Sequence, residues 1–486
     1  MISNKYTDNI ETQVLVVGSG AGGAITAATL AAAGYSVLIV EEGPEINTKN
    51  LATHSPEAMQ LLYRNNGLSP ILGNTNIAFV EGRCVGGSTE INSALWHRTP
   101  ADAIARWIND FHVNALSLKE IDSLFSEIEA EVNISYYNSK DIPVNSSLLK
   151  IGAEKLGWCI EEVPRAQSNN LQLSQFDAGT KNSMSRTYIP KAIAAGGKLL
   201  PNCKITRLHY KNKRINSVSG IVTKNNQKTK VTINAEFIFL CSGATQTPLI
   251  LLSSNIKRNI GNSLKIHPML KVAALFDKTL NSHKAPLPIY QVREFYPNIT
   301  LGGSIFTPGF LAILLSEDWN TNYTAIKNWK KMSMYYTACC GNGAGKIKIF
   351  PFTGEAMLLY KISKEDQINL SKGLAYLCEL LFQSGAKALY PSLKYPTVIY
   401  PSDNYNTFIE NPIPIENMSL SNVHAFSTCP MGEKKEICAT DSFGKVYDFE
   451  NLYISDASII PDAPGVNPQG TVMALALRNA KHFLQE

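Results

Sequence analysis

The chain has 486 residues, of which 44% are hydrophobic and 17% are charged, so it is long enough to form about two or three structural units with their own cores. Its 45 Lys and Arg and 40 Asp and Glu residues leave a net charge of +5 without long basic runs, which argues against a nucleic-acid partner. The nine cysteines contain no CxxC pair, which argues against a disulfide framework and structural zinc, and we expect no metal site.

Residues 1–13 are polar and lack the basic start and the apolar core of a signal peptide. No part of the sequence approaches the roughly 18 consecutive apolar residues that a membrane-spanning helix needs. We therefore expect a cytoplasmic protein. Contact with a membrane surface is compatible with the polar start and the lack of a long apolar stretch. The sequence leaves the oligomeric state open.

A β-α-β unit follows this polar start. The apolar runs VLVV (14–17) and VLIV (37–40) indicate buried parallel strands. The alanine-rich segment between them predicts a helix that ends near Gly34 and can approach the sheet closely.

Gly18, Gly20 and Gly23 form a GxGxxG motif at the turn from strand to helix. The first glycine permits the tight turn, the second lets a pyrophosphate approach the main chain, and the third lets helix and strand pack closely. Glu41 ends the second strand, where an acidic side chain can accept hydrogen bonds from an adenosine ribose. The sequence therefore predicts a dinucleotide site, and this motif alone leaves FAD and NAD open.

The segment EGRCVGGSTEINSALWHRTP (81–100) carries a second glycine loop. Gly86, Gly87 and Ser88 supply main-chain freedom and a hydroxyl group, and Asn92 follows them. This pattern is typical of a chain that wraps a planar cofactor and its phosphates. Taken alone, the segment also fits an ordinary glycine turn.

Further strands of the first sheet are expected at FIFLC (237–241) and LYIS (452–455), so the nucleotide-binding unit is predicted to be discontinuous. Between 281 and 420 the sequence changes to scattered aromatic residues and alternating stretches. An amphipathic helix is predicted over 364–384, ending at Gly385. Alternating stretches followed by an amphipathic helix predict a second, mostly antiparallel α+β unit.

A third glycine cluster, CGNGAGK (340–346), departs from the phosphate-binding P-loop pattern. Cys340 stands where a P-loop needs glycine, and Ile347 replaces the Ser or Thr. The stretch KIKIF that follows indicates a strand rather than a helix. We therefore expect a hairpin turn here.

Two polar residues near the C-terminus are candidate catalytic groups. His424 lies in the irregular stretch VHAFSTCPMG (423–432), and Asn467 lies at the start of a predicted helix that has Pro468 in its first turn. Each residue also has an ordinary structural explanation, because a lone histidine is often only a packed side chain and an asparagine often caps a helix.

Five motifs occur in order along the chain: GSGAGG with Glu41, GRCVGGSTEIN, LCSGATQTPLILLSS, VHAFSTCPMG and LYISDASIIPDAPGVNPQGTVMALALRN. From about Val14 to the C-terminus, the chain thereby resembles the glucose-methanol-choline (GMC) oxidoreductases, a family of FAD-dependent alcohol-oxidising enzymes. The segments NTNIAFVEGRCVGGSTEINSALWHRTP and LSKGLAYLCELLFQSGAKALYP are most similar to the long-chain alcohol oxidases of this family, and the ending GVNPQGTVMALALRN is most similar to its cholesterol oxidases. Both comparisons favour a lipophilic alcohol.

The resemblance implies an α/β, Rossmann-like FAD-binding domain that is discontinuous over 1–110, 180–280 and 421–486. It implies an α+β, mostly antiparallel-sheet region for substrate binding, or cap, over 111–179 and 281–420. The sheet of this second region would face the isoalloxazine ring.

The resemblance also implies roles for single residues. In the FAD site, Gly18, Gly20 and Gly23 would hold the pyrophosphate, Glu41 the adenosine ribose, the loop with Gly86, Gly87, Ser88 and Asn92 the flavin side, and Asp456 and Ala457 the ribityl and pyrophosphate region. His424 and Asn467 fall on the two active-site positions of the family, side by side at the flavin. An imidazole can accept the hydroxyl proton of an alcohol, an Asn amide can donate to the developing alkoxide, and flavin N5 takes the hydride.

Some positions depart from the family pattern. The usual glycine and proline of the histidine motif are Ser427 and Ala425 here, and the sequence leaves open how they affect the main chain near His424 and the oxygen reactivity. Some members attach FAD through a histidine at the position of Ile91, which predicts non-covalent FAD here. His267 in LKIHPML matches a family pattern that is mostly structural, and we leave it outside the predicted site.

The leading interpretation is an FAD-dependent oxidase or dehydrogenase for the CH–OH group of a lipophilic alcohol, long-chain or sterol-like, with oxygen or a quinone-like electron acceptor. The alternatives are a lyase or light-driven decarboxylase of the same fold, an NAD-dependent dehydrogenase, and a non-catalytic flavin-binding protein. His424 and Asn467 argue against a decarboxylase, which has no need of this proton-accepting pair. Visible absorption by bound FAD would exclude the NAD enzyme, and flavin reduction by an alcohol would exclude the non-catalytic protein.

Overall fold

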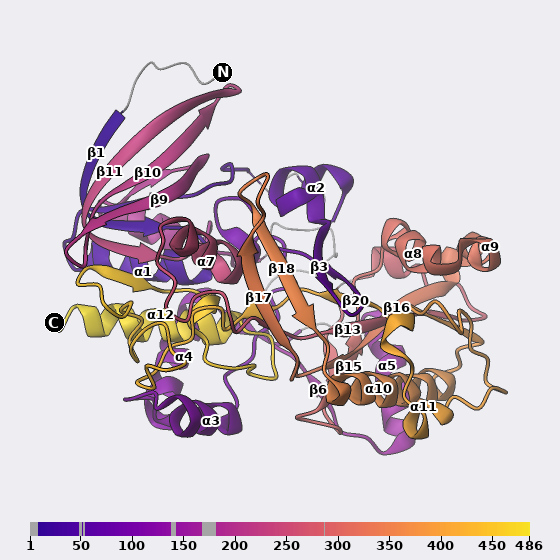
Figure 1. The fold of residues 1–486 in the computed structure, drawn as a ribbon. Helices are drawn as coiled ribbons and strands as arrows, with labels where there is room; N and C mark the ends of the chain where they lie inside the picture. Colours follow the sequence, from indigo (N-terminus) through magenta and orange to yellow (C-terminus); the bar gives the residue numbers. More distant parts are fainter. Residues whose placement is uncertain (1–7, 48–50, 52–53, 138–141, 168–180, 286) are drawn as a thin grey trace.

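The computed structural model describes residues 8–47, 51, 54–137, 142–167, 181–285 and 287–486. Figure 1 shows two units side by side, the first around the long strands at its left and the second around the sheet at its right. The first unit holds a seven-stranded sheet and the second an eleven-stranded sheet. The expected pairing of a Rossmann-like α/β domain with a sheet-rich α+β domain is therefore confirmed.

The first sheet is built around buried parallel strands. Its order is β8 (Lys198–Leu200), β2 (Val37–Val40), β1 (Asp8–Val17), β11 (Gln227–Leu240), β10 (Arg214–Lys224) and β9 (Cys203–Lys211), with β22 (Leu452–Ile454) beside β11. The pairs among β8, β2, β1, β11 and β22 are parallel, and β9 to β11 form an antiparallel meander. The predicted strands at 237–241 and 452–455 thus join the predicted β-α-β unit, as expected.

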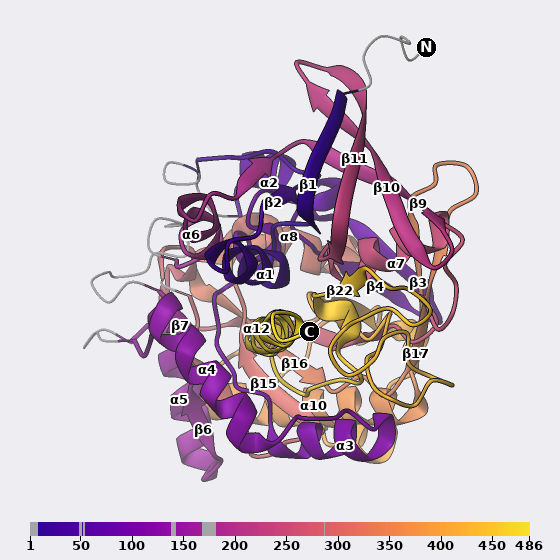
Figure 2. The same cartoon turned by 90° about the vertical axis from the view of Figure 1, so that its left-hand side faces the viewer.

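Two helices from opposite ends of the sequence pack beside this sheet. Figure 2 looks down the axis of α12 (Gln469–Phe483) and shows it next to α1 (Ala21–Ala32). The helix α1 approaches β22 closely because Gly22 has no side chain: a Cβ there would lie 1.9 Å from the main-chain oxygen of Ser455. The same core includes apolar residues of α3 (Ala101–Phe111) and α4 (Leu118–Val132), and α6 (Tyr188–Ala194) packs against α1.

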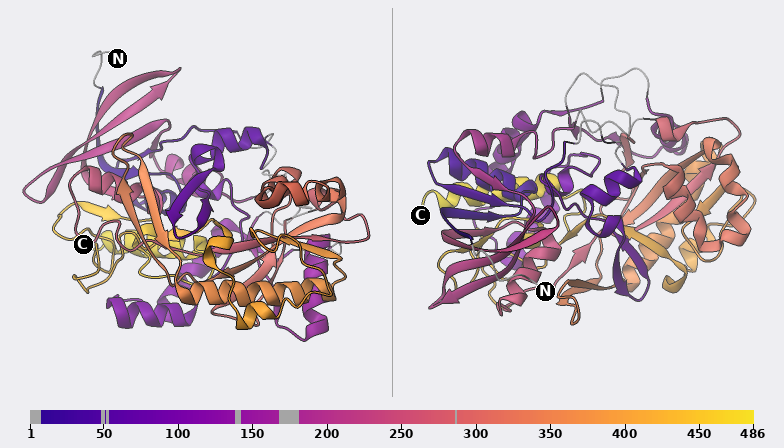
Figure 3. Two further views of the ribbon diagram at one scale, coloured as in Figure 1. Left: turned by 45° about the vertical axis from the view of Figure 1, so that its right-hand side comes forward. Right: turned by 90° about the horizontal axis from the view of Figure 1, so that it is seen from above.

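The second sheet is mostly antiparallel. Its order is β17 (Ala344–Ile349), β18 (Ala356–Lys361), β3 (Ser69–Gly73), β4 (Asn76–Phe79), β20 (Ser419–Asn422), β13 (Met269–Leu275), β16 (Met332–Cys339), β15 (Ile299–Gly303), β14 (Tyr290–Val292) and β6 (Ile160–Glu162), with β19 (Ala388–Pro391) beside β13. The hairpin of β17 and β18 lies between the two units, against α7 (Gly243–Ser253) (Figure 3).

One face of the second sheet is covered by α5 (Val144–Leu156) and α10 (Lys364–Gln383). Ser363 and Asp366 form a capping box at the start of α10, and Leu370, Leu374 and Leu377 are fully buried against the sheet. The helix predicted over 364–384 is therefore confirmed.

The strand β13 divides its side chains between two environments. Leu270 and Val272 belong to the core beneath α10, whereas Met269 and Lys271 face a cavity on the other side of the sheet. Beyond them, Ala273 packs with the core of α8 (Pro308–Leu315). The remaining elements are α2 (Pro56–Leu62), α9 (Trp319–Asn322), α11 (Thr407–Glu410), β5 (Ile134–Ser135), β7 (Arg165–Ala166), β12 (Lys265–Ile266) and β21 (Ala425–Phe426).

The glycine cluster at 340–346 differs from its prediction. The strand after it is present as β17, but β16 and β17 do not pair with each other, so the hairpin turn expected here is wrong. The segment is a loop between distant strands, and the carboxylate of Asp366 accepts hydrogen bonds from the N–H groups of Asn342 and Gly343, at 2.8 Å each.

The two sheets alternate along the chain more often than the predicted domain ranges do. The strands β3, β4 and β13 belong to the second sheet, although 69–79 and 269–275 fall in the ranges predicted for FAD binding. The helix α4, from the range predicted as cap, packs against α12. The domain boundaries themselves stay a prediction. Among the described residues, no helix is long and apolar enough to cross a membrane.

Candidate active site

A cavity of about 1110 Å³ lies between the two sheets. Its wall runs from the turn after β1, past the second sheet, to the side chains of α8. Binding sites for single small molecules are typically about 300–1,000 Å³. The cavity is therefore large enough for a dinucleotide together with a second molecule.

The turn between β1 and α1 presents main chain to this cavity. Gly18 has a φ of +107°, and a Cβ there would lie 2.3 Å from the main-chain oxygen of Cys241. A Cβ on Gly23 would lie 2.0 Å from the oxygen of Gly18. No side chain caps α1 at Gly20, so the positive end of the helix is open to an anion. These features fit a pyrophosphate.

Glu41 stands next to this turn, at the end of β2. Its Oε2 accepts hydrogen bonds from the N–H and the hydroxyl of Ser19, at 3.0 and 2.8 Å, and its Oε1 accepts from the N–H of Gly43 at 2.9 Å. Burial raises the pKa of Glu41, and these donors act against that shift. The carboxylate borders the cavity in the position predicted for the adenosine ribose.

The second glycine loop touches the first. Gly86 and Gly87 have φ values of +93° and +58°, and a Cβ on Gly87 would lie 2.9 Å from the Cα of Gly20. The Ser88 hydroxyl accepts a hydrogen bond from the N–H of Gly82 at 3.0 Å. The Asn92 amide donates to Gln469, at the first turn of α12. The loop is thus fixed between the glycine turn and the C-terminal helix.

Lys181, which the sequence analysis did not single out, also holds this loop. Its ammonium donates to the main-chain oxygens of Glu90 and Asn92, at 2.6 and 3.0 Å. Burial lowers the pKa of Lys181 to about 8. No local pattern in the sequence pointed to this residue, because its partners lie about 90 positions earlier in the chain.

Asp456 joins three segments at the wall of the cavity. Its Oδ2 accepts hydrogen bonds from the N–H of Gly243, at 2.8 Å, and from the hydroxyl of Thr247, and its Oδ1 accepts from the N–H and hydroxyl of Ser458. The carboxylate therefore lies at the N-terminal end of α7, where the helix dipole favours a negative charge. Ala457 follows Asp456 and also borders the cavity.

His424 and Asn467 meet at the cavity, as predicted. The amide nitrogen of Asn467 lies 3.3 Å from Nε2 of His424. The helix α12 starts at Gln469 without a side-chain cap, so the alternative in which Asn467 merely caps this helix does not hold. Both residues border the cavity, and neither is fully buried.

His267, which the sequence analysis left outside the predicted site, lies next to His424 in the structure. Its Nδ1 lies 3.1 Å from Nδ1 of His424, and it borders the cavity. An amide nitrogen can only donate, so Nε2 of His424 accepts from Asn467, and Nδ1 of His424 carries the proton that it donates to His267. The LKIHPML motif carried the signal, and only the fold shows the contact.

The histidines at the cavity are held neutral. Burial, helped by the charge of His97, lowers the pKa of His424 to about 4. Burial and the charge of His424 lower the pKa of His267 well below its usual range. At neutral pH, His424 therefore has an unprotonated Nε2 that can take a proton.

The main chain at Ser427, beside His424, adopts a conformation that is typical of glycine. Ser427 has a φ of +65°, in the left-handed region that glycine adopts most readily, and its side chain is fully buried. Among the described residues, the hydroxyl of Ser427 finds no hydrogen-bond partner. The serine is therefore accommodated in the conformation that a glycine would adopt, at a cost in strain.

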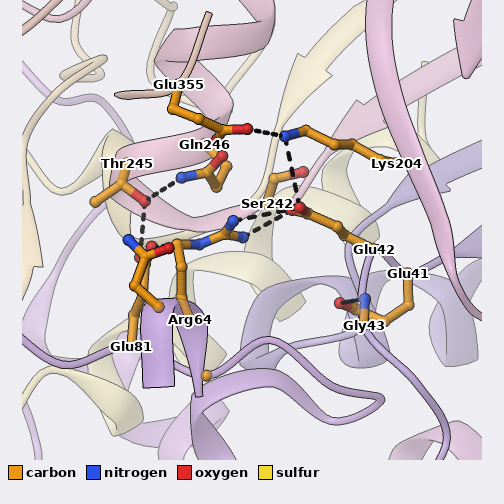
Figure 4. Close-up of polar contacts among 12 residues, drawn as sticks. Glu41, Glu42, Gly43, Arg64, Glu81, Lys204, Ser242, Thr245, Gln246 and Glu355 are labelled. Carbon is orange, nitrogen blue, oxygen red and sulfur yellow. Dashed lines mark hydrogen bonds and ion pairs between the residues drawn. The ribbon is translucent and has the colours of Figure 1, made fainter. Parts of the chain in front are cut away.

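A charged cluster that the sequence analysis did not predict lies at the other end of the cavity (Figure 4). Arg64 lies between Glu42 and Glu81, at 2.8 and 2.6 Å. Lys204 lies between Glu42 and Glu355, at 3.7 and 2.6 Å. Although burial acts to raise it, the pKa of Glu42 is lowered by the charges of Arg64 and Lys204.

The cluster connects the two units. Glu42 follows β2 and Lys204 lies on β9, both in the first sheet, while Arg64 lies between α2 and β3 and Glu355 comes from the turn between β17 and β18. Thr245 at the start of α7 adds a hydrogen bond from its hydroxyl to Glu81, at 2.7 Å. Across the described ranges of the chain, no group of three His, Cys, Asp or Glu side chains could hold a metal ion.

Comparison with known proteins gives matches along most of the chain. Two models of a family described as GMC oxidoreductase match residues 15–269 and 356–476. An uncharacterized GMC-type oxidoreductase of Sinorhizobium fredii is 34% identical over 480 residues, which cover 98% of this chain and 95% of that protein. A long-chain-alcohol oxidase of Arabidopsis thaliana is 25% identical and covers 96% of this chain and 67% of its own length.

The fold has solved counterparts. The crystal structure of pyridoxine 4-oxidase from Mesorbium loti superposes with a TM-score of 0.74 at 16% sequence identity, covering 98% of this chain and 99% of that one. At this identity, the likeness concerns the fold.

Proposed function

Because this chain belongs to the GMC oxidoreductase family of FAD-dependent enzymes that oxidise alcohols, we propose that it oxidises the CH–OH group of a lipophilic alcohol, long-chain or sterol-like, with His424 as proton acceptor. The contact between Nε2 of His424 and the amide of Asn467 at the cavity is the observation that carries this proposal.

The residues around the cavity fit FAD. The glycine turn with Gly18, Gly20 and Gly23 would hold the pyrophosphate, and Glu41 the ribose. The loop with Gly86, Gly87, Ser88 and Asn92 would lie against the flavin side, and Asp456 with Ala457 near the ribityl chain. Ile91 borders the cavity and offers no nucleophile, which supports non-covalent binding.

The protein residues divide the work of alcohol oxidation. When the alcohol binds, Nε2 of His424 gives up its hydrogen bond from Asn467 and takes the hydroxyl proton, and the Asn467 amide donates instead to the oxygen as it becomes negative. His267 accepts from Nδ1 of His424 and so keeps the lone pair of Nε2 directed at the substrate. FAD, when bound, accepts the hydride that leaves the alcohol carbon, and the product is the carbonyl compound.

The substrate end of the cavity supports a lipophilic alcohol. Phe310, Ile313 and Leu314 of α8 and Met334 of β16 border it. Two apolar side chains, Phe352 at the turn of the β17–β18 hairpin and Leu68 just before β3, are 90% and 65% exposed, which supports peripheral contact with a membrane.

The test is an anaerobic visible spectrum of the purified protein, followed by medium-chain, long-chain and sterol alcohols. We expect a flavin absorption band that one of these alcohol classes bleaches. Air or an added quinone should then restore the band. Faster recovery with air identifies an oxidase, and faster recovery with the quinone identifies a dehydrogenase. A flavin band that no alcohol bleaches would overturn the proposed activity and leave the fold intact.

His267 tests the proposed proton path as a positioning residue. We expect His267→Ala to lower kcat about 10–100-fold with little change in KM, because Nδ1 of His424 loses its acceptor and the tautomer is no longer fixed. His267→Asn should recover much of the rate, because its amide oxygen can accept the same hydrogen bond. Equal losses in both variants would point to packing alone.

The pH dependence of flavin reduction follows from the lowered pKa of His424. A group with a pKa of about 4 stays neutral above that pH, so the rate should be flat from neutral pH down to about pH 5 and fall as the pH passes through 4. An ordinary histidine would cause the fall near pH 6.5. Stopped-flow anaerobic reduction measures this, and a fall centred near pH 6.5 would contradict the role given to burial.

A further inference from the structure

Lys271 is a cation among the apolar residues at the substrate end of the cavity. It lies on β13, and it shares the cavity-facing side of the strand with Met269, whereas Leu270 and Val272 are buried in the core on the opposite side. His267 borders the same cavity at the start of this row. The ammonium group of Lys271 is therefore presented to the space where a substrate would lie.

No described residue neutralises this ammonium group. Within the described ranges, Lys271 bonds only through its main chain, with Ser392, and makes no ion pair. Burial alone lowers the pKa of Lys271, without help or opposition from a carboxylate. Lys271 is only partly exposed, and a cation withdrawn from water without a counter-charge costs free energy.

The surroundings of Lys271 suit an anion. Its charge is close enough to lower the pKa of His54, whose Nδ1 lies 3.0 Å from the Tyr63 hydroxyl. Tyr336 lies directly opposite Lys271 on β16 and borders the cavity, and its oxygen accepts a hydrogen bond from the Gln291 amide at 2.7 Å. The hydroxyl hydrogen of Tyr336 can still be donated to a ligand.

Three other charged groups on the cavity wall, Arg64, Lys204 and Glu41, contrast with Lys271. Arg64 and Lys204 each contact two carboxylates at the cofactor end, and Glu41 accepts three hydrogen bonds from the protein. These groups are satisfied before any ligand arrives, and Lys271 is not.

Resting on the proposed function, we infer that the alcohol substrate carries a carboxylate far from its hydroxyl group, and that Lys271 binds this carboxylate. His267 and Lys271 are four residues apart in the chain, a separation of at most about 13 Å between their Cα atoms. The hydroxyl at His424 and the carboxylate at Lys271 are therefore joined by an aliphatic chain, which the apolar side chains of α8 and Met334 accommodate. The substrate class is an aliphatic acid with a hydroxyl group near the opposite end.

The first test compares a ten-carbon ω-hydroxy acid with the primary alcohol of the same length. The holoenzyme should show a higher kcat/KM for the hydroxy acid. Lys271→Met should lower that value by about 10–100-fold, the range expected for a hydrogen bond to a charged group, and leave the value for the alcohol nearly unchanged. Lys271→Arg should retain the preference, and Lys230→Met, an exposed lysine on β11, is the matched control.

A binding measurement separates this inference from the proposed activity. Decanoate has the carboxylate without the hydroxyl, so calorimetric titration of the holoenzyme measures the carboxylate site without turnover. Binding that Lys271→Met weakens at least about 10-fold supports the inference even if no alcohol reduces the flavin. Equal binding to both proteins, or equal kcat/KM for acid and alcohol, overturns it and leaves the oxidation of simple alcohols standing.

Discussion

Replacing His424 with alanine should slow anaerobic flavin reduction by alcohol about 10³-fold while FAD stays bound. Nε2 of His424 is the neutral acceptor beside the Asn467 amide, and a positioned general base contributes about 10²–10⁴-fold to a rate. The glycine turn and the Gly86 loop do not depend on this side chain, so the visible spectrum of the oxidised protein should persist. Stopped-flow reduction at saturating alcohol measures the change.

Two comparisons make this expectation specific. His209→Ala removes a histidine on β9, remote from the cavity wall, and should leave the reduction rate unchanged. Asn467→Ala should cost less than His424→Ala, because it removes a hydrogen bond to the oxygen and leaves the base in place. Flavin reduction at the wild-type rate in His424→Ala would exclude this residue as the proton acceptor.

Replacing Gly20 with valine should weaken FAD binding about 100-fold or more, equivalent to about 2.7 kcal/mol, without unfolding the protein. A Cβ at Gly20 would have one protein atom within 4 Å, the Cα of Gly87 at 3.9 Å. The apo fold therefore has room for the side chain, which would instead occupy the space where the pyrophosphate approaches the start of α1. Titration of apo protein with FAD measures the affinity.

Thermal denaturation supplies the control for this variant. The apo forms of wild type and Gly20→Val should melt at similar temperatures, and FAD should raise the melting temperature of the wild type much more, because a ligand stabilises the state that binds it. Gly309→Val on α8, where the nearest atom to a Cβ is 3.8 Å away, should bind FAD normally. Unchanged FAD affinity in Gly20→Val would contradict the placement of the pyrophosphate.

Local patterns predicted the parts of the fold that depend on neighbours in sequence. The run VLVV, the glycine turn and the run VLIV form a β-α-β unit whose spacing is set within about 25 residues. The helix α10 likewise carries its own signals, a capping box at Ser363 and a stripe of buried leucines. In both cases burial and hydrogen bonding follow from adjacent residues.

Local sequence patterns could not predict the contacts between segments that are distant in the chain. His267 and His424 are 157 positions apart, and only the antiparallel pairing of β12 with β21 brings their rings together. The cluster around Arg64 and Lys204 draws on segments from opposite halves of the sequence. The segment at 340–343 resembled a turn because glycines favour turns, yet the strands that it joins pair with other partners.

The role of Asn467 could not be predicted from its residue type alone. A residue before a helix is usually explained as a cap, and the sequence offered that alternative. The amide instead reaches the ring of His424, because β21 places the histidine motif beside the start of α12. The resemblance to a family suggested this pair, and the fold provides its geometry.

The order in which this chain is made sets a limit on when its first unit can form. The helix α1 packs against α12, and Gly22 of α1 lies close to the main-chain oxygen of Ser455, directly after β22. Those partners follow about 430 residues later in the chain, and synthesis at about 5–20 residues per second takes some tens of seconds to reach them. During that time the early β-α-β segment has no complete core to bury its apolar face. We therefore expect the nascent chain to depend on chaperones until α12 emerges.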